Sequence, residues 1–477
     1  MTDVVVVGSG PNGLAAAVAL AQAGASVHVL EGHAEIGGGT RTAELTRPGF
    51  LHDVCSAVHP MGVLSPYLRT LPLEEHGLKW LHPRASVAHP LDGEPAVLLR
   101  RSLEETASEL GDDAAAYRAL VQPFLRDPHG LLADALAPLR LPRHPWLMLR
   151  FGLRAIRSAA GLAKRFRGTR ARALLAGCAG HSILPLDRPL TGAMGLMFLL
   201  TGHVESWPVA AGGSHAITRA LASLLRTHGG RVETGRLVRT PADLPPARLY
   251  LFDTSPAQLA TVAGSVLPQG YLRRLARFRY GPGVFKLDWA LDGPIPWSDA
   301  RCREASTVHV AGTFEELAAA EAAVWHGEHP ERPFVLLAQQ SEVDPSRAPA
   351  GNHTGWAYCH VPAGSTMDQT EAIERQIERF APHFRDRILE RHVMRAPDFE
   401  RYNPSYVGGA IAGGVADLAQ LFTRPVARRN PYTTPNPRVL LCSASTPPGG
   451  GVHGMCGYWA ARTALRRLAK YTVAPLG

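Results

Sequence analysis

The stretch VVVVGSGPNGLAAAVALAQAGASVHVLEGHAEIGGGTR, residues 4–41, decides the fold of this chain. It opens with four valines, a β-branched run typical of a buried parallel strand. A GxGxxG sequence follows, and then an alanine-rich helix over residues 11–23 and a second strand over residues 26–30 are predicted. Such a unit binds a dinucleotide, because the glycines let the backbone approach a diphosphate at the positive helix N-terminus. The residues predicted to line this site are Gly8, Gly10, Pro11, Asn12 and Gly13.

Glu31 ends the second predicted strand. It lies near the distance, ~20 residues after the first glycine, at which an acidic side chain takes the ribose hydroxyls. A carboxylate accepts hydrogen bonds from a free ribose diol and repels a 2′-phosphate. We therefore expect the adenosine of FAD or NAD, and not that of NADP, at this position.

A second glycine cluster, GGGTRT, begins shortly after Glu31 and contains an arginine suited to pairing with a diphosphate. It resembles the GG motif of the glutathione-reductase-type FAD superfamily, especially its amine-oxidase and phytoene-desaturase branch. That branch usually has GGR, whereas here a glycine holds the arginine position and the arginine lies two residues later. The resemblance implies FAD as the cofactor, with contacts from Gly38, Gly39, Thr40 and Arg41.

Two later segments resemble the remaining FAD-binding parts of the same family. In residues 206–238 a GG-helix-GG arrangement precedes a strand, and the resemblance places the backbone of Val238 against the adenine. In residues 438–465 a strand, a proline and glycine turn and a helix resemble the closing flavin motif of phytoene-desaturase-like proteins. A helix N-terminus there stabilises negative charge on a reduced flavin. The implied contacts are Ser443, Ala444, His453, Gly454 and Met455.

The composition narrows the class of protein. With 477 residues, 45% of them hydrophobic, the chain is long enough for two or three domains with sizeable cores. No apolar run is long enough to span a membrane and no basic, apolar leader precedes the first strand, so we expect a cytoplasmic protein. The six scattered cysteines lack any CxxC and predict buried thiols, and no metal site is expected. The net charge of +9 is largely spread along the chain, so nucleic acid is not expected as a partner.

We predict an α/β fold in which a glutathione-reductase-type FAD-binding Rossmann fold carries an inserted mixed-sheet substrate domain and a helical cap. The FAD-binding domain is predicted to consist of three segments separated by the other parts. The predicted FAD-binding segments are 1–72, 206–270 and 415–477, the substrate domain covers 73–142 and 271–414, and the helical cap covers 143–205.

The predicted cap contains a basic segment over about residues 145–172, which is expected to form an amphipathic helix. Such a helix lies either in the interface of an anionic membrane or over the core of its own protein, and both interpretations stay open. The charged stripe consists of Arg150, Arg154, Arg157 and Lys164, and the apolar stripe of Leu149, Leu153, Ile156, Ala160 and Ala163.

The resemblance to phytoene-desaturase-like flavoproteins covers essentially the whole chain and implies an FAD-dependent oxidoreductase. In that family a largely apolar substrate loses hydride to FAD, and oxygen, a quinone or another acceptor then takes the electrons. One dinucleotide-binding unit and no dithiol are found in the sequence, so nicotinamide is not expected as a bound partner. The sequence carries no signal for an oligomeric state.

Three residues are candidates for the catalytic step, which needs orientation and exclusion of water more than a strong acid or base. His453, near the start of the last predicted helix, and His59, on a turn-rich loop, can hold or deprotonate a substrate. Tyr458, one helical turn beyond Gly454, is the third. The alternative functions are an amine oxidase with an aromatic cage, a carotenoid-type isomerase or saturase, and a flavin-binding interaction protein without turnover. An aromatic cage could draw on Trp459 and Tyr406.

Overall fold

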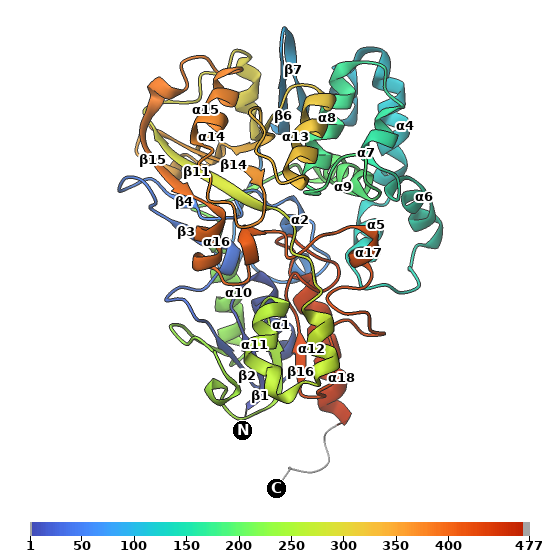
Figure 1. The fold of residues 1–477 in the computed structure, drawn as a ribbon, viewed down its shortest axis with the longest axis vertical. Helices are drawn as coiled ribbons and strands as arrows, with labels where there is room; N and C mark the ends of the chain where they lie inside the picture. Colours follow the sequence, from blue (N-terminus) through green and yellow to red (C-terminus); the bar gives the residue numbers. More distant parts are fainter. Residues whose placement is uncertain (1, 471–477) are drawn as a thin grey trace.

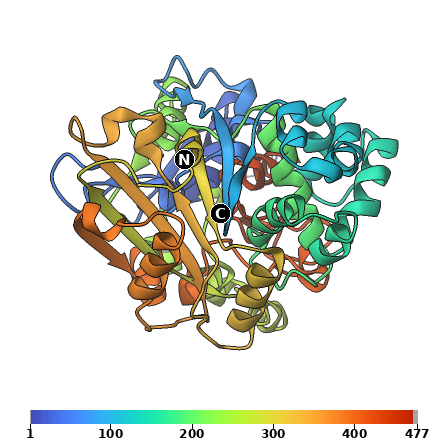
Figure 2. The same ribbon diagram turned by 90° about the horizontal axis from the view of Figure 1, so that it is seen from above.

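The computed structural model describes residues 2–470, which form a lower sheet domain, an upper sheet domain and a helical region in the view of Figure 1. The stretch over residues 4–41 belongs to the lower domain. Seen from above, the upper sheet and the helical region lie side by side (Figure 2). The α/β class and the separate mixed sheet predicted from the sequence are confirmed.

The lower domain is built on a five-stranded parallel sheet with the order β16-β10-β1-β2-β9. Its strands come from three separate segments of the chain, as predicted for the FAD-binding fold. The predicted strand over residues 231–238 is shorter than expected, because pairing with its neighbour ends at Glu233. The strands are β1 (Thr2–Val7), β2 (Val27–Leu30), β9 (Arg231–Glu233), β10 (Ala247–Phe252) and β16 (Val439–Leu441).

Helices cover both faces of this sheet, which explains the unbroken run of valines in β1. Val4 and Val6 pack in the same core as the α1 helix, whereas Val5 and Val7 pack with residues of α11 and α12. The α1 helix also contacts α10 and α18. These helices are α1 (Pro11–Gln22), α10 (His215–Thr227), α11 (Pro256–Ala263), α12 (Gln269–Leu275) and α18 (Met455–Lys470).

The upper sheet has seven strands in the order β15-β11-β14-β13-β12-β6-β7 and is mixed, because β12 pairs in parallel with β6 while the other pairs are antiparallel. Two distant parts of the sequence therefore meet where β12 pairs with β6. The strands are β6 (Ala85–Leu91), β7 (Glu94–Leu99), β11 (Gly283–Leu291), β12 (Ala305–Val310), β13 (Val335–Ala338), β14 (His353–Val361) and β15 (Ile388–Met394).

The helical region begins at residue 103, well before the boundary of 143 that the sequence predicted for the cap. The basic segment is not one helix, because it breaks after Ala155 and again before Thr169. The helices of the region are α3 (Leu103–Ser108), α4 (Ala114–Leu125), α5 (Pro128–Ala135), α6 (Pro145–Ala155), α7 (Ala159–Ala163), α8 (Thr169–Gly180) and α9 (Thr191–Val204).

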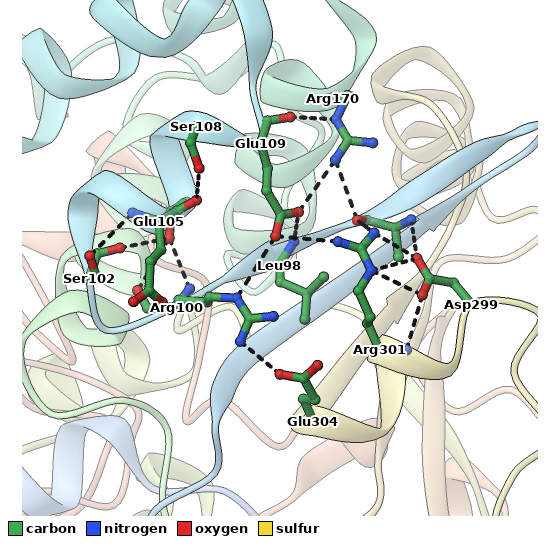
Figure 3. Close-up of polar contacts among 12 residues, drawn as sticks. Leu98, Arg100, Ser102, Glu105, Ser108, Glu109, Arg170, Asp299, Arg301 and Glu304 are labelled. Atoms are coloured by element: carbon green, nitrogen blue, oxygen red, sulfur yellow. Dashed lines mark hydrogen bonds and ion pairs between the residues drawn. The ribbon is translucent and has the colours of Figure 1, made fainter.

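A network of charged side chains joins the helical region to the edge of the upper sheet (Figure 3). Glu109, after α3, pairs with Arg170 of α8 and with Arg100, which follows β7. Glu109 also pairs with Arg301 from the loop before β12. Because four separate segments share these partners, the network favours a fixed position of the helices relative to the sheet.

Short elements connect these parts. The connecting helices are α2 (Pro60–Val63), α13 (Phe314–Trp325), α14 (Gln340–Val343), α15 (Thr370–Glu378), α16 (Ala396–Tyr402) and α17 (Leu418–Leu421), and the short strands are β3 (Thr42–Ala43), β4 (His52–Asp53), β5 (Trp80–Leu81) and β8 (Val209–Ala210).

Candidate functional site

One large cavity of about 970 Å³ connects the lower domain with the upper sheet and the helical region. This volume is at the upper end of the ~300–1,000 Å³ range of small-molecule sites. We call it the central cavity. Its lower part is lined by the GxGxxG loop, the second glycine cluster and the turn before α18. Its upper part is lined by residues of α6, α9, β12, β13 and β14 and by the segment that follows α8.

The GxGxxG loop leaves no room for side chains. A Cβ atom on Gly10 would lie 2.8 Å from a carboxylate oxygen of Asp253, and one on Gly13 would lie 2.2 Å from the carbonyl oxygen of Gly8. Gly8 has a φ of +101°, which L-residues rarely adopt. Pro11 occupies the first turn of α1, and Pro11 and Asn12 also line the cavity. The loop is therefore shaped for close approach of a ligand to the backbone.

The Glu31 carboxylate lies buried beside this loop and is held by four donors. One oxygen accepts hydrogen bonds from the backbone N–H and the hydroxyl of Ser9, at 2.9 and 2.5 Å. The other accepts from the N–H of His33 at 2.8 Å and from the guanidinium of Arg41 at 3.1 Å. A buried carboxylate at the cavity wall fits the ribose of an unphosphorylated adenosine.

The second glycine cluster lies against the same part of the cavity. Gly38, Gly39, Thr40 and Arg41 all line it. The guanidinium of Arg41 lies 5.3 Å from the centre of the Tyr402 ring, which fixes its position beside Glu31. Val238 also lines this lower part, as the resemblance implied. The glycine cradle, the buried carboxylate and the nearby arginine together fit the adenosine diphosphate half of FAD.

The turn before α18 closes the lower part of the cavity. Ser443, Ala444 and His453 line it, whereas Gly454 and Met455 lie behind the lining residues. The Nδ1 atom of His453 accepts the N–H of Met455 at 3.0 Å, so its Nε2 atom carries the proton. Burial lowers the pKa of His453 to about 4. At neutral pH this residue is therefore uncharged, and its Nε2 atom is enclosed without a partner among the described residues, so the geometry does not support proton removal from a substrate.

Two of the three catalytic candidates lie away from the cavity. Val58 and Pro60 line it, but His59 points to α10, where its Nε2 atom lies 2.8 Å from the hydroxyl of Ser214. Tyr458 stacks on Tyr67 with ring centres 4.5 Å apart and does not line the cavity. The geometry gives no support to a catalytic role for either residue. The side chain of His59 points away from the cavity although both of its neighbours line it, and the side chain of Tyr458 packs on Tyr67.

The upper part of the cavity has an aromatic wall that the sequence did not identify. Trp356 and Tyr358 alternate along β14 and so share one face, and Trp207 and Phe198 lie nearby on the lining. Tyr406 also lines the cavity, but Trp459 does not, since its indole N–H binds the carbonyl of Leu136. The alternation of aromatic and small residues in GWAYCHV was the available signal for this wall, although it does not show which face of the strand lies toward the cavity.

A buried ion pair lies behind the aromatic wall. The Lys286 ammonium lies 5.6 Å from the centre of the Trp356 ring and is hydrogen-bonded to Asp288. Although burial acts in the opposite direction, the charge of Lys286 holds the pKa of Asp288 below its ordinary value. Neither side chain lines the cavity, so this pair supports the wall and fixes the Trp356 ring.

Asp253 is a second acidic residue on the lining of the lower part, and it follows β10. It accepts the N–H of Gly13 at 2.8 Å. Burial raises its pKa to about 7, the Glu31 charge adds to the rise, and the Gly13 N–H opposes it. Since the folded state then holds a proton that the unfolded chain releases at pH ~4, this residue favours the folded state less as the pH rises from ~4 to ~7.

The raised pKa of Asp253 also predicts a pH dependence of FAD binding. Above pH 7 the ionised carboxylate would face the diphosphate, so FAD affinity should fall with rising pH by at most about tenfold per pH unit. The Asp253→Asn variant should lack this dependence between pH 6 and 8, measured by equilibrium titration of the flavin. A wild-type affinity that rises or stays level over this range would contradict the assignment.

Comparisons with known proteins agree with this geometry. Residues 6–71 match the NAD(P)-binding Rossmann-like domain. The pyridine nucleotide-disulfide oxidoreductase domain-containing protein 2 of Rattus norvegicus is 27% identical over 98% of this chain and 94% of its own length.

Solved structures share the fold over almost the whole chain. An oxidoreductase of Methanosarcina mazei superposes with a TM-score of 0.65 at 16% identity, covering 98% of this chain and 100% of its own. Cyclohexylamine oxidase of Brevibacterium oxydans gives a TM-score of 0.59 at 16% identity, covering 98% and 99%. The chain therefore has the same fold as these oxidoreductases.

Proposed function

We propose that this protein is an FAD-dependent oxidoreductase that dehydrogenates a largely apolar organic substrate. The observation that carries the proposal is the continuity of the central cavity, which joins a dinucleotide cradle to a wall of aromatic and aliphatic side chains. A bound flavin would accept hydride from the substrate, and oxygen, a quinone or another acceptor would take the electrons. A desaturation, as in phytoene-desaturase-like proteins, is the reaction type proposed.

The distribution of charge in the cavity favours an apolar substrate. The charged residues on its lining belong to the glycine loops and to the segments around β9, β10, α16 and α17. The lining residues of α6, α9, β12, β13, β14 and the segment after α8 are apolar, aromatic or neutral polar at neutral pH. The protein groups there can orient a hydrophobic chain and exclude water, which are the requirements of hydride transfer.

The experiment that tests this function mixes the FAD-loaded protein anaerobically with candidate reductants. We expect slow reduction by NADH or NADPH, because one dinucleotide unit is identified in the sequence and FAD occupies it. Polyenes, acyl chains and amines are tested separately by bleaching of the flavin absorbance. Fast bleaching by a nicotinamide would contradict the scheme.

A second candidate is amine oxidation, favoured by the aromatic side chains of Trp356, Tyr358 and Tyr406 on the cavity lining. The only carboxylates among the described lining residues are Glu31 and Asp253, and both lie beside the glycine loop. An ammonium group in the upper part would have no carboxylate partner there, which makes this candidate the weaker one. Bleaching by amines alone would reverse that order.

We also propose that the protein contacts an anionic membrane surface around the mouth of the cavity. Ile156, Leu418 and Phe422 line the cavity and are also exposed at 54, 44 and 53%, so the cavity opens between them. Trp146, Leu149 and Leu153 of α6 are exposed as well. The first part of the predicted apolar stripe, Leu149, Leu153 and Ile156, thus faces outward, whereas Ala163 is buried. Phe151 and Ala155 form the buried face of α6.

The charge around this mouth complements an anionic surface. Residues 136–172 contain ten arginine and lysine residues and no aspartate or glutamate. No helix in residues 2–470 combines the length and apolar character needed to cross a bilayer. Contact would therefore be peripheral, with apolar side chains in the interface and arginines near the headgroups.

Vesicle binding tests the membrane proposal. Replacing Arg143, Arg150 and Arg157 with glutamine should weaken binding to anionic vesicles by about 3 kcal/mol, or roughly 100-fold, since each basic residue near the surface contributes about 1 kcal/mol. The matched control replaces Arg84, Arg226 and Arg273, which are exposed elsewhere. Sedimentation at low salt in which both triple variants behave alike would contradict the proposal.

A further inference from the structure

The upper part of the central cavity contains a histidine whose polar edge is open to the ligand. His181 follows α8 and lines the cavity, and its Nε2 atom lies 2.9 Å from the Nε2 atom of His309 on β12. Its Nδ1 atom has no protein partner among the described residues and is not among their enclosed unpaired atoms. This nitrogen is therefore available to a bound molecule.

The position of the ring is fixed from several sides. Phe198 and Trp207 lie 4.5 and 5.4 Å from the His181 ring, centre to centre. His309 is completely buried beneath α8, where a Cβ atom on Gly177 would come within 2.3 Å of its Nδ1 atom. The glycine thus allows α8 to approach β12 closely enough for the two histidines to meet.

The pair has a preferred arrangement of protons. The Nδ1 atom of His309 is buried without a partner, and a buried unpaired N–H is rarer in folded proteins than an underused acceptor. His309 therefore donates from Nε2 to Nε2 of His181, which leaves the second ring with its proton on Nδ1. Burial lowers the pKa of His181 to about 3, so the ring is uncharged at neutral pH.

Resting on the proposed function, we infer that His181, positioned by His309, donates a hydrogen bond from Nδ1 to an uncharged oxygen acceptor on an otherwise apolar substrate. A ketone, an ester, an ether or a hydroxyl group has this chemistry. A carboxylate or an ammonium ion does not fit, because the lining residues of α9, β12, β13 and the segment after α8 include no ionised partner.

Two hydroxyl-bearing side chains lie on the same wall, but their oxygen atoms are enclosed, so the Nδ1 atom of His181 alone is open to a ligand here. Thr307 lies two residues before His309 on the same face of β12, and Ser182 directly follows His181. Both line the cavity, both are at least nine-tenths buried, and neither hydroxyl has a partner among residues 2–470. Three polar side chains therefore interrupt an otherwise apolar wall at one place.

The experiment compares four ligands of equal chain length: 2-nonanone, nonane, nonanoate and nonylamine. Their affinities for the FAD-loaded protein are measured by calorimetry, which requires no turnover. The wild type should bind the ketone about 3- to 10-fold more tightly than nonane, the usual value of one hydrogen bond. The His181→Phe variant should lose this difference and keep its FAD and its affinity for nonane.

Further variants separate positioning from general damage. His309→Phe should also reduce the preference for the ketone, and His181→Gln, which keeps a donor, should restore part of it. His326→Phe is the matched control, because His326 is exposed at the end of α13. It should behave as the wild type.

An equal affinity of the wild type for ketone and alkane would overturn the inference, as would a His181-dependent preference for nonanoate or nonylamine. If His181→Phe fails to fold, the ketone preferences of the wild type and of His181→Gln decide the inference. A protein that lacks FAD but shows the His181-dependent ketone preference would overturn the proposed function and support the subsite. A protein that binds FAD but lacks that preference would overturn the subsite and leave the proposed function supported.

Discussion

The Gly457→Ala variant should lose FAD and show the largest loss of stability of any single methyl added to this chain. Gly457 lies in α18 where this helix crosses α1, and its Cβ atom would be placed 1.8 Å from the carbonyl oxygen of Asn12. Both groups are fixed by helical backbone, so neither can move without separating the two helices. We expect a decrease of about 3 kcal/mol in the free energy of unfolding, the upper end for overpacking.

The loss of FAD follows from the same displacement. Asn12 belongs to the cradle that lines the lower cavity, and α18 begins two residues after His453. Thermal unfolding and the flavin content of the purified protein measure both effects. The control is Gly270→Ala in the exposed first turn of α12, where the nearest atom is 4.0 Å away, and it should leave stability unchanged or slightly higher. Equal behaviour of the two variants would contradict the packing argument.

The lower domain was predictable because its local chemistry has few alternatives. The valines of β1 alternate between two buried faces of the sheet. The glycines of GxGxxG are needed where the backbone is approached closely by other protein atoms and by a ligand. Glu31 is bound within its own βαβ unit, so spacing alone located it. The segments around Val238 and His453 were placed by resemblance, and the structure puts both on the cavity lining.

The upper part of the cavity could not be predicted, because its wall is assembled from segments far apart in the chain. His181 and His309 meet only through the packing of α8 on β12, which glycine at position 177 permits. The side-chain direction of His59 depends on the geometry of a turn, and local residue propensities do not predict that geometry. The sequence of α6 likewise does not show which face of the helix packs on the core and which face is exposed.

The clearest test of the cofactor is the Glu31→Arg variant, which should be purified almost without FAD. In the wild type the buried carboxylate holds the Ser9 hydroxyl, two backbone N–H groups and the guanidinium of Arg41. The substitution places two guanidinium groups side by side in a buried position and removes the acceptor for the ribose hydroxyls. Removing one partner of a buried charged pair costs about 2–5 kcal/mol, which corresponds to roughly 30- to 4,000-fold in affinity.

Titration of the apoprotein with FAD, followed by fluorescence of the flavin, measures this loss. The control is Glu35→Arg, which makes the same change of charge at an exposed position four residues away. Because the long-range field changes equally in both variants, a difference between them isolates the contacts of the buried carboxylate. The Glu35→Arg protein should bind FAD like the wild type, and the released cofactor should be FAD rather than FMN. Retention of FAD by Glu31→Arg at wild-type affinity would show that the adenosine half lies elsewhere.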